Sequence, residues 1–461
     1  MRWLAGRIPP VTATQLGIFR VFFACAVAAT LFDLRLPTEP FPRELHLTTH
    51  QLAQFEWVRS LAARPDLVER MEIAGLVLAG LFALGIATRA SFTALVFVLT
   101  VWTLVRLTRT GAHVWSALLV GVWAMLPVRW GDGFSVDAWL RRRLARPAAP
   151  SDARTEYGYA LWIPGVVFGT AMFAAGVAKL YSSGIGWITN GTVKYIFVID
   201  AARAPTDWGL WVAQHNWAAV LLSAGGIFTE LALVFAVFVR RPLARVPFAV
   251  LGFGLLFGFW AFQHELWLAW WTLYLAFFIP WTSIFRARTP EHASPDPIPA
   301  GSRLLRPAQW AALAAVIGLQ AAAIVLRIEI APVLSDYPMY STTYGSIEEF
   351  EKRNPIPATY RFTARFADRT QRDVTAIAET LQVDDVIRDA HNRIVDDPAH
   401  RETHLETLQA ATARLSNHFG EPVTGLVIRI DQRAFDFNEG AFRWKYINHP
   451  IGDYTIPAVS D

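Results

Sequence analysis

The chain has little charge and almost no cysteine. Charged residues make up 17% of its 461 residues, against about a quarter in typical soluble proteins. The single cysteine, Cys25, excludes an intrachain disulfide and any cysteine-based metal or redox pair. The sequence also lacks a glycine-rich nucleotide-binding loop, HExxH and GxSxG. Familiar soluble-enzyme chemistry is therefore unsupported, and we expect no metal site.

Apolar residues are abundant instead. Hydrophobic residues make up 54% of the chain and aromatic residues 13%, more apolar surface than a soluble protein of this size hides. Segments near the roughly 20 residues that a membrane-spanning helix needs recur along the sequence. They lie at 13–32, 71–88, 90–108, 112–128, 159–181, 217–239, 245–263, 265–285 and 308–327. We predict a mainly α-helical polytopic membrane protein with about nine transmembrane helices.

The distribution of Arg and Lys predicts the orientation. Arg2 and Arg7 precede the first span, which is long and lacks a convincing cleavage site, so we interpret it as an uncleaved anchor. With the N-terminus in the cytoplasm, the inner segments carry 16 Arg and Lys residues and the outer segments nine, as the positive-inside rule requires. The basic residues are scattered and form no patch for nucleic acid. We expect a multi-pass protein of the cell membrane, surrounded by lipid, with its C-terminus outside.

The chain changes character after Arg327. Residues 359–367 and 423–437 alternate as half-buried strands do. Residues 401–419 place Leu405, Leu408, Ala411, Leu415 and Phe419 on one helical face, and Gly420 follows as a C-terminal stop. The pattern predicts two domains, a transmembrane domain at 1–328 and an extracytoplasmic α+β domain at 329–461.

Ionisable residues inside the apolar spans are the first candidates for function, because burying them is costly. Lys179 lies near the end of the span 159–181, where it either serves a site or snorkels to the interface. Arg20 and Glu230 lie mid-span, and each either pairs structurally, with the other as a partner, or lines a site. His113 opens the fourth span on the same outer side as Lys179; a lone histidine is more often structural. His264 lies in an outer turn, where polarity is expected anyway.

Two further inferences concern the chemistry of Lys179 and the packing of the helices. In an apolar pocket, desolvation disfavours an ammonium and yields a neutral amine that accepts a proton, so Lys179 is a candidate base. The spacings Gly165/Gly169 and Gly254/Gly258 indicate close helix packing rather than a site.

Several stretches resemble the HTTM domain and its relative, vitamin K-dependent γ-glutamyl carboxylase. They are LGIFR at 16–20 with Phe32-Asp33 after it, His113 leading into a span followed by FSVDAWL, and above all AGVAKL at 175–180 followed by Trp187, Gly191 and Tyr195. The resemblance covers roughly residues 13–285.

The resemblance implies an enzyme that uses reduced vitamin K or a menaquinone-type quinol, with O2 and CO2 as co-substrates. Lys179 would deprotonate the quinol, His113 would steady the developing charge, and the oxygenated product would drive carboxylation of a protein or peptide glutamate on the outer face. Trp187, Tyr195 and Trp260 would lie at the quinol site. The chain departs from the carboxylase pattern at residues 110–112 and at Phe259-Trp260.

Two alternatives stay open at this point. One is a non-catalytic or peptide-maturation HTTM protein. The other is a small-molecule transporter in which Arg20 and Glu230 line the path.

Overall fold

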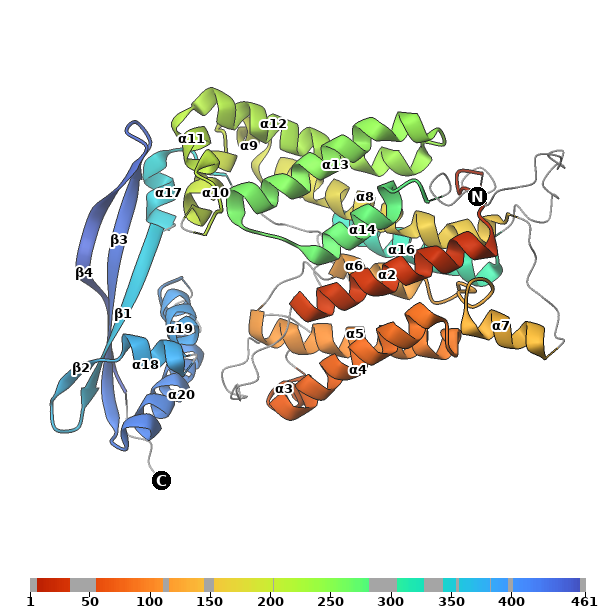
Figure 1. Ribbon diagram of the computed structural model, residues 1–461. Helices are drawn as coiled ribbons and strands as arrows, with labels where there is room; N and C mark the ends of the chain where they lie inside the picture. Colours follow the sequence, from red (N-terminus) through yellow and green to blue (C-terminus); the bar gives the residue numbers. More distant parts are fainter. Residues whose placement is uncertain are drawn as a thin grey trace.

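The computed structural model describes residues 6–33, 55–110, 116–144, 153–201, 203–281, 305–326, 343–353, 356–381, 383–396 and 401–456. They form a bundle of apolar helices and, beside one end of it, a smaller unit of sheet and helices (Figure 1).

The helices of the bundle differ widely in length. The longer ones are α2 (Ala13–Asp33), α4 (Pro65–Leu84), α5 (Thr88–Thr110), α8 (Thr155–Ser183), α12 (Asn216–Ala232), α13 (Pro242–Gln263) and α16 (Pro307–Leu326). Shorter ones are α3 (Glu56–Ala62), α6 (Ser116–Ala124), α7 (Val136–Arg143), α9 (Gly186–Thr189), α10 (Val193–Asp200), α11 (Trp208–Gln214), α14 (Leu268–Phe278) and the 3-10 helix η3 (Leu233–Phe238), which continues α12.

Six helices in the described part of the chain are long and apolar enough to cross a membrane: α2, α5, α8, α12 with η3, α13 and α16. They indicate a multi-pass membrane protein. The other three predicted spans overlap α4, α6 and α14, which are too polar or too short to meet this criterion within the described residues. Helix α4 carries Glu69, Arg70 and Glu72 near its start, α6 has 9 residues and α14 has 11.

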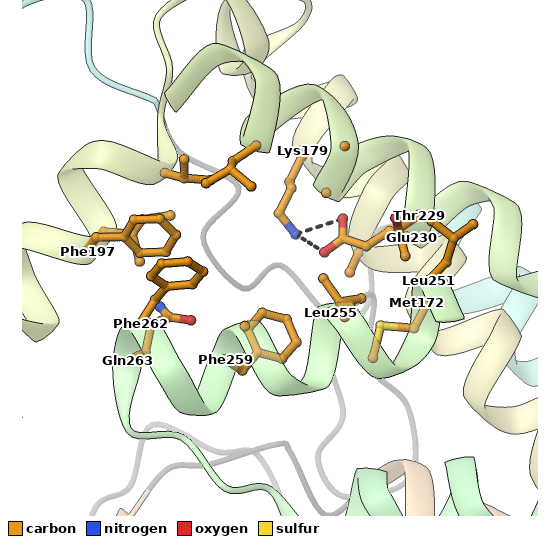
Figure 2. A pocket seen from close by; sticks show the side chains of 18 of the residues that line it. Met172, Lys179, Phe197, Thr229, Glu230, Leu251, Leu255, Phe259, Phe262 and Gln263 are labelled. Carbon is orange, nitrogen blue, oxygen red and sulfur yellow. Dashed lines mark hydrogen bonds and ion pairs between the residues drawn. The ribbon is translucent and has the colours of Figure 1, made fainter. Parts of the chain in front are cut away.

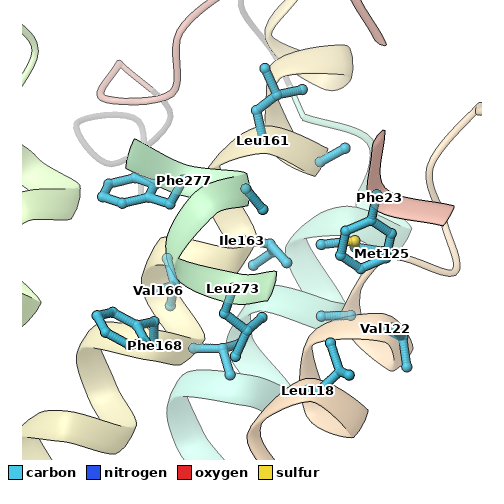
Figure 3. Close-up of a cluster of buried hydrophobic side chains, with 14 of the residues drawn as sticks. Phe23, Leu118, Val122, Met125, Leu161, Ile163, Val166, Phe168, Leu273 and Phe277 are labelled. Carbon is cyan, nitrogen blue, oxygen red and sulfur yellow. The ribbon is translucent and has the colours of Figure 1, made fainter. Parts of the chain in front are cut away.

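Helix α8 is the centre of the bundle. In its most apolar stretch 83% of the residues are buried, against 11% in α13. Two glycines let neighbours approach it closely, since a Cβ at Gly165 would clash with the ring of Phe277 and one at Gly169 would lie 2.8 Å from the backbone of Val234. The surrounding core, drawn in Figure 3, includes Phe23, Leu118, Met125, Ile163 and Leu273.

Helices α12 and α13 present an apolar outer face. Leu221 and Phe228 on α12 are 62% and 64% exposed, and Val250 and Phe253 on α13 are 64% and 50% exposed. Such a continuous apolar surface is a liability in water, whereas hydrocarbon solvates it without cost. This apolar side of the bundle fits the multi-pass membrane character that the six long apolar helices indicate.

The C-terminal unit is an antiparallel sheet of four strands in the order β2-β1-β3-β4, with helices against it (Figure 1). The strands are β1 (Ile356–Phe366), β2 (Gln371–Asp373), β3 (Val423–Asp436) and β4 (Ala441–Thr455); the helices are α17 (Ile347–Arg353), α18 (Thr375–Thr380), α19 (Asp384–Asp396) and α20 (Arg401–Phe419). The predicted α+β character is confirmed.

The sequence placed three of these elements closely. The predicted strands at 359–367 and 423–437 are β1 and β3, and the predicted helix at 401–419 is α20. Leu408, Ala411 and Leu415 are fully buried on its inner face, and Gly420 ends it at a φ of 68°, a conformation that favours glycine. The helices α17, α18 and α19 and the two edge strands, β2 and β4, were not predicted.

The C-terminal unit contacts the bundle through aromatic side chains. Tyr195 on α10 packs against Tyr344 and Phe350 of the C-terminal unit and against Phe437 beyond β3, with ring centroids 4.7 to 5.8 Å apart. Asn190, just before α10, donates a hydrogen bond to the carbonyl of Tyr344. The predicted domain boundary at 328/329 lies outside the described residues.

Candidate functional site

A cavity of about 370 Å³ lies among α8, α10, α12 and α13. Its wall is almost entirely aromatic, aliphatic or glycine, with Lys179, Glu230, Thr229 and Gln263 as the polar exceptions among the residues described. Two of its lining residues, Leu222 on α12 and Val250 on α13, are 40% and 64% exposed. The cavity therefore reaches the surface of the protein beside these two residues.

Lys179 and Glu230 form a buried ion pair in this cavity (Figure 2). The ammonium Nζ of Lys179 donates to Glu230 Oε1 at 2.7 Å and to Oε2 at 3.0 Å. The two residues are 5% and 4% exposed. Since the ammonium is held against a carboxylate inside the protein, Lys179 does not snorkel to the interface. Its Nζ also lies 5.5 Å from the ring centroid of Trp187, near enough for a cation–π contact.

The local sequence explains how the pair forms. Lys179 lies near the end of α8 and Glu230 near the end of α12, and Gly176 lets the helices approach there, since a Cβ on it would lie 3.0 Å from the side chain of Leu231. Two opposite charges taken out of water persist only when they neutralise each other and have their hydrogen bonds satisfied. The pairing is therefore what allows either residue to lie at this depth.

Arg20 is not the partner of Glu230. Its guanidinium donates to three backbone carbonyls, those of Trp130 at 2.8 Å, Phe134 at 2.6 Å and Ala83 at 3.3 Å. The structural ion pair between Arg20 and Glu230 that the sequence left open is therefore wrong. Arg20 instead ties α2 to the end of α4 and to the segment before α7, in a part of the bundle away from the cavity.

The two motifs LGIFR and FSVDAWL meet at this junction. Besides the bond from Arg20 to Phe134, the carboxylate of Asp137 accepts hydrogen bonds from the backbone N–H groups of Ala87 and Thr88 at 2.9 and 2.7 Å. Asp137 thereby satisfies backbone N–H groups at the start of α5, which have no hydrogen-bond partner within α5. Both motifs have a structural role here.

The other predicted site residues fall in different places. Trp187 lines the cavity and is 3% exposed. Tyr195 turns to the C-terminal unit and Trp260 packs against Phe257, while their neighbours Ile196, Phe197, Phe259 and Phe262 line the cavity. His264 follows the last residue of α13 at a φ of 61° and ends that helix. His113 lies outside the described residues.

The two glycine pairs have different roles. Gly165 and Gly169 pack closely against neighbouring elements, as predicted. Gly254 and Gly258 instead line the cavity, and a Cβ at Gly254 would meet nothing within 4 Å. For this second pair the packing interpretation is wrong, because the missing side chains leave room for the cavity.

Sequence reasoning missed Gln263 and Asp200. Gln263 lines the cavity, and its amide Nε2 donates to Asp200 Oδ2 at 3.0 Å. Each is the last residue of its helix, α13 and α10, so in the sequence they look like ordinary polar residues at span ends.

Outside the spans, burial raises the pKa of the Tyr195 phenol, and the nearby carboxylate of Glu349 raises it further. Burial also lowers the pKa of its neighbour Lys194. Tyr195 therefore stays neutral at the boundary between the cavity helix and the C-terminal unit.

No protein-family model, curated protein or solved structure matches this chain. The resemblance to the HTTM domain and to γ-glutamyl carboxylase stays a prediction that rests on the motifs themselves.

Proposed function

We propose that this protein is a membrane enzyme that binds a reduced lipophilic naphthoquinone in the cavity and, like vitamin K-dependent γ-glutamyl carboxylase, couples its oxygenation to carboxylation of a protein or peptide glutamate. The observation that carries the proposal is the Lys179–Glu230 ion pair, buried in a cavity whose wall is mostly apolar. The topology proposed with it has about nine spans, a cytoplasmic N-terminus and an outer C-terminal domain.

The cavity suits a flat, water-insoluble ligand. Its volume of about 370 Å³ lies in the range of small-molecule sites, roughly 300 to 1,000 Å³. Phe259 and Phe262 offer ring faces, and the opening beside Leu222 and Val250 lets such a ligand enter from the bilayer without crossing water. These features support a quinol better than a polar solute.

The ion pair is suited to take a proton from a ligand hydroxyl. In that step the ligand O–H bond breaks, an O–H bond forms on the Glu230 carboxylate, and the negative charge left on the ligand oxygen is offset by the Lys179 ammonium. A fixed charge in a dry site stabilises such an anion far more than water-screened charge does. In this proposal Glu230 is the proton acceptor, and Lys179 is the group that stabilises the anion.

The bound quinol, with O2, would supply the strong base that removes the γ-proton of a glutamate and lets the carbanion capture CO2. His113 is proposed, from the resemblance, to steady the developing charge. The C-terminal unit, which contacts α10 beside the cavity, is the proposed place where a protein or peptide substrate binds.

Quinol-dependent oxygen uptake by the purified protein in lipid nanodiscs tests the proposal. Lys179→Ala removes the charge that stabilises the ligand anion and is expected to lower the rate by about 10²- to 10³-fold, the usual cost of losing one such donor. Lys194→Ala, which alters a lysine that contacts Asn216 outside the cavity, is the matched control and should keep the wild-type rate. Mass spectrometry of co-expressed peptides should show a gain of one CO2 on glutamate.

Loss of activity through misfolding needs a separate check. Lys179→Met combined with Glu230→Leu removes both charges and should leave a folded but inactive protein. Wild-type oxygen uptake in this double variant would remove the pair from the mechanism. Flux of a small molecule into proteoliposomes, without oxygen uptake, would favour the transporter instead.

A further inference from the structure

The cavity has a second polar end, formed by Gln263, whose amide is hydrogen-bonded to Asp200. Both side chains are buried, each 3% exposed. Figure 2 shows Gln263 beyond the rings of Phe262 and Phe259, across the cavity from the Lys179–Glu230 pair. The cavity is therefore apolar in its middle and polar at two ends, which is the pattern of an aromatic ring that carries oxygens on opposite sides.

The orientation of the Gln263 amide is fixed by its partner. Asp200 also pairs with Arg203, whose Nη2 lies 2.6 Å from Asp200 Oδ1, so Asp200 is held as a carboxylate. A carboxylate only accepts hydrogen bonds, and Gln263 must therefore turn its NH2 group towards Asp200. Its carbonyl Oε1 is directed elsewhere and has no hydrogen-bond partner among the residues that the structure describes.

The two ends thus differ in what they offer a ligand. At one end the Lys179 ammonium uses two N–H groups on Glu230 and keeps a third that can donate to a ligand oxygen. At the other end Gln263 Oε1 can only accept. A hydroxyl satisfies it, whereas a carbonyl oxygen would face it acceptor to acceptor and leave two buried oxygens unpaired.

We propose that Gln263, positioned by Asp200, accepts a hydrogen bond from the second hydroxyl of the ligand and makes the cavity selective for the hydroquinone over the quinone. This assignment rests on the proposed function and adds to it a redox preference set by residues outside the ion pair. Gln263 contacts the ligand, and Asp200 is a positioning residue. An oxidised product would be bound more weakly than the substrate and would leave towards the bilayer.

The test is anaerobic titration of menadione and of its hydroquinone into the full chain in lipid nanodiscs, with empty nanodiscs subtracted. The wild-type protein should bind the hydroquinone about 10- to 100-fold more tightly, the range expected for one unsatisfied buried acceptor. For a two-electron couple each tenfold preference raises the midpoint potential of the bound ligand by about 30 mV, which gives a second readout independent of turnover.

Asp200→Asn is the decisive variant. An asparagine NH2 can donate to Gln263 Oε1, so the Gln263 amide is free to turn and present its own NH2 to the ligand. The ratio of hydroquinone affinity to quinone affinity should fall towards one or reverse. Gln263→Met keeps the length of the side chain, loses the acceptor and should also abolish the preference. Asp207→Asn changes an exposed acid in the next loop and should leave the preference unchanged.

The outcomes separate the two proposals. If neither redox form binds the wild-type protein, the proposed function fails and this assignment fails with it. If both forms bind and the ratio of their affinities is unchanged in Asp200→Asn and Gln263→Met, the assignment alone is overturned. Thermal unfolding of each variant in nanodiscs shows that the protein measured is folded.

Discussion

At the scale of single residues, the described part of the bundle contains two buried cations, Arg20 and Lys179, that are stabilised differently. Arg20 uses its fork of N–H groups on three backbone carbonyls, and this suits a structural role because the carbonyls do not change state. Lys179 has a carboxylate as its partner, which can gain or lose a proton. The difference in partner, rather than depth, makes Lys179 the better candidate for chemistry.

The pairing predicts a strong dependence of stability on both partners. Glu230→Leu leaves the Lys179 ammonium buried without compensation and should cost about 3 to 5 kcal/mol of unfolding free energy. Adding Lys179→Met should recover most of that loss, because an apolar pair of similar volume carries no desolvation penalty. The measurement is the thermal unfolding midpoint of single and double variants in detergent. A double variant no more stable than Glu230→Leu would show that the two charges are not coupled.

At the scale of secondary-structure elements, some glycines allow close contact between helices, and others leave space for the cavity. Gly169 on α8 is pressed against the backbone of Val234 in η3, whereas Gly226 on α12 lines the cavity and has open space where its Cβ would be. The same residue type therefore allows close contact between α8 and η3 and leaves space for the cavity beside α12.

This division predicts opposite effects of one methyl group. Gly169→Ala should lower the unfolding midpoint by several degrees, because the contacting atom is backbone and cannot swing away. Gly226→Ala should be neutral or slightly stabilising, since alanine favours helix by about 1 kcal/mol. Gly226→Leu should keep the fold and fill the cavity, weakening hydroquinone binding at least tenfold. Equal destabilisation by Gly169→Ala and Gly226→Ala would contradict this view of the packing.

At the scale of the whole molecule, α10 connects the cavity to the C-terminal unit. Val193, Ile196 and Phe197 line the cavity, while Tyr195 and Val198 pack with Phe350 and Phe435 of the C-terminal unit. A short helix with both faces occupied transmits a loss of packing on one face to the other, because its position is set by both.

Truncating the aromatic contact should therefore loosen the cavity wall. Phe350 is 1% exposed, and Phe350→Ala should speed hydrogen exchange of the α10 amides and weaken ligand binding. Trp444→Ala, on the outer strand β4 where the side chain is 51% exposed, is the control and should change neither. Unchanged exchange in α10 for Phe350→Ala would mean that the two units are held together elsewhere.

Local sequence patterns determined the membrane character of this protein and several of its helices and strands. Apolar runs of spanning length led to the membrane assignment, because a helix must hide its backbone from lipid wherever it crosses. Period-two alternation predicted β1 to within three residues, and the spaced leucines with Gly420 after them predicted both ends of α20. Lys179 and Glu230 were recognised individually, since a charge in an apolar run is costly whatever surrounds it.

Only the tertiary structure decided which groups meet. It decided that Glu230 pairs with Lys179 rather than with Arg20, and that Gln263 contacts Asp200. It also decided which glycine pair packs against a neighbour and which lines the cavity. All of these contacts are between residues far apart along the chain. Sequence spacing carries no signal for such contacts, because they depend on how separate helices cross. The cavity itself is a space that several helices leave between them, and no single segment encodes it.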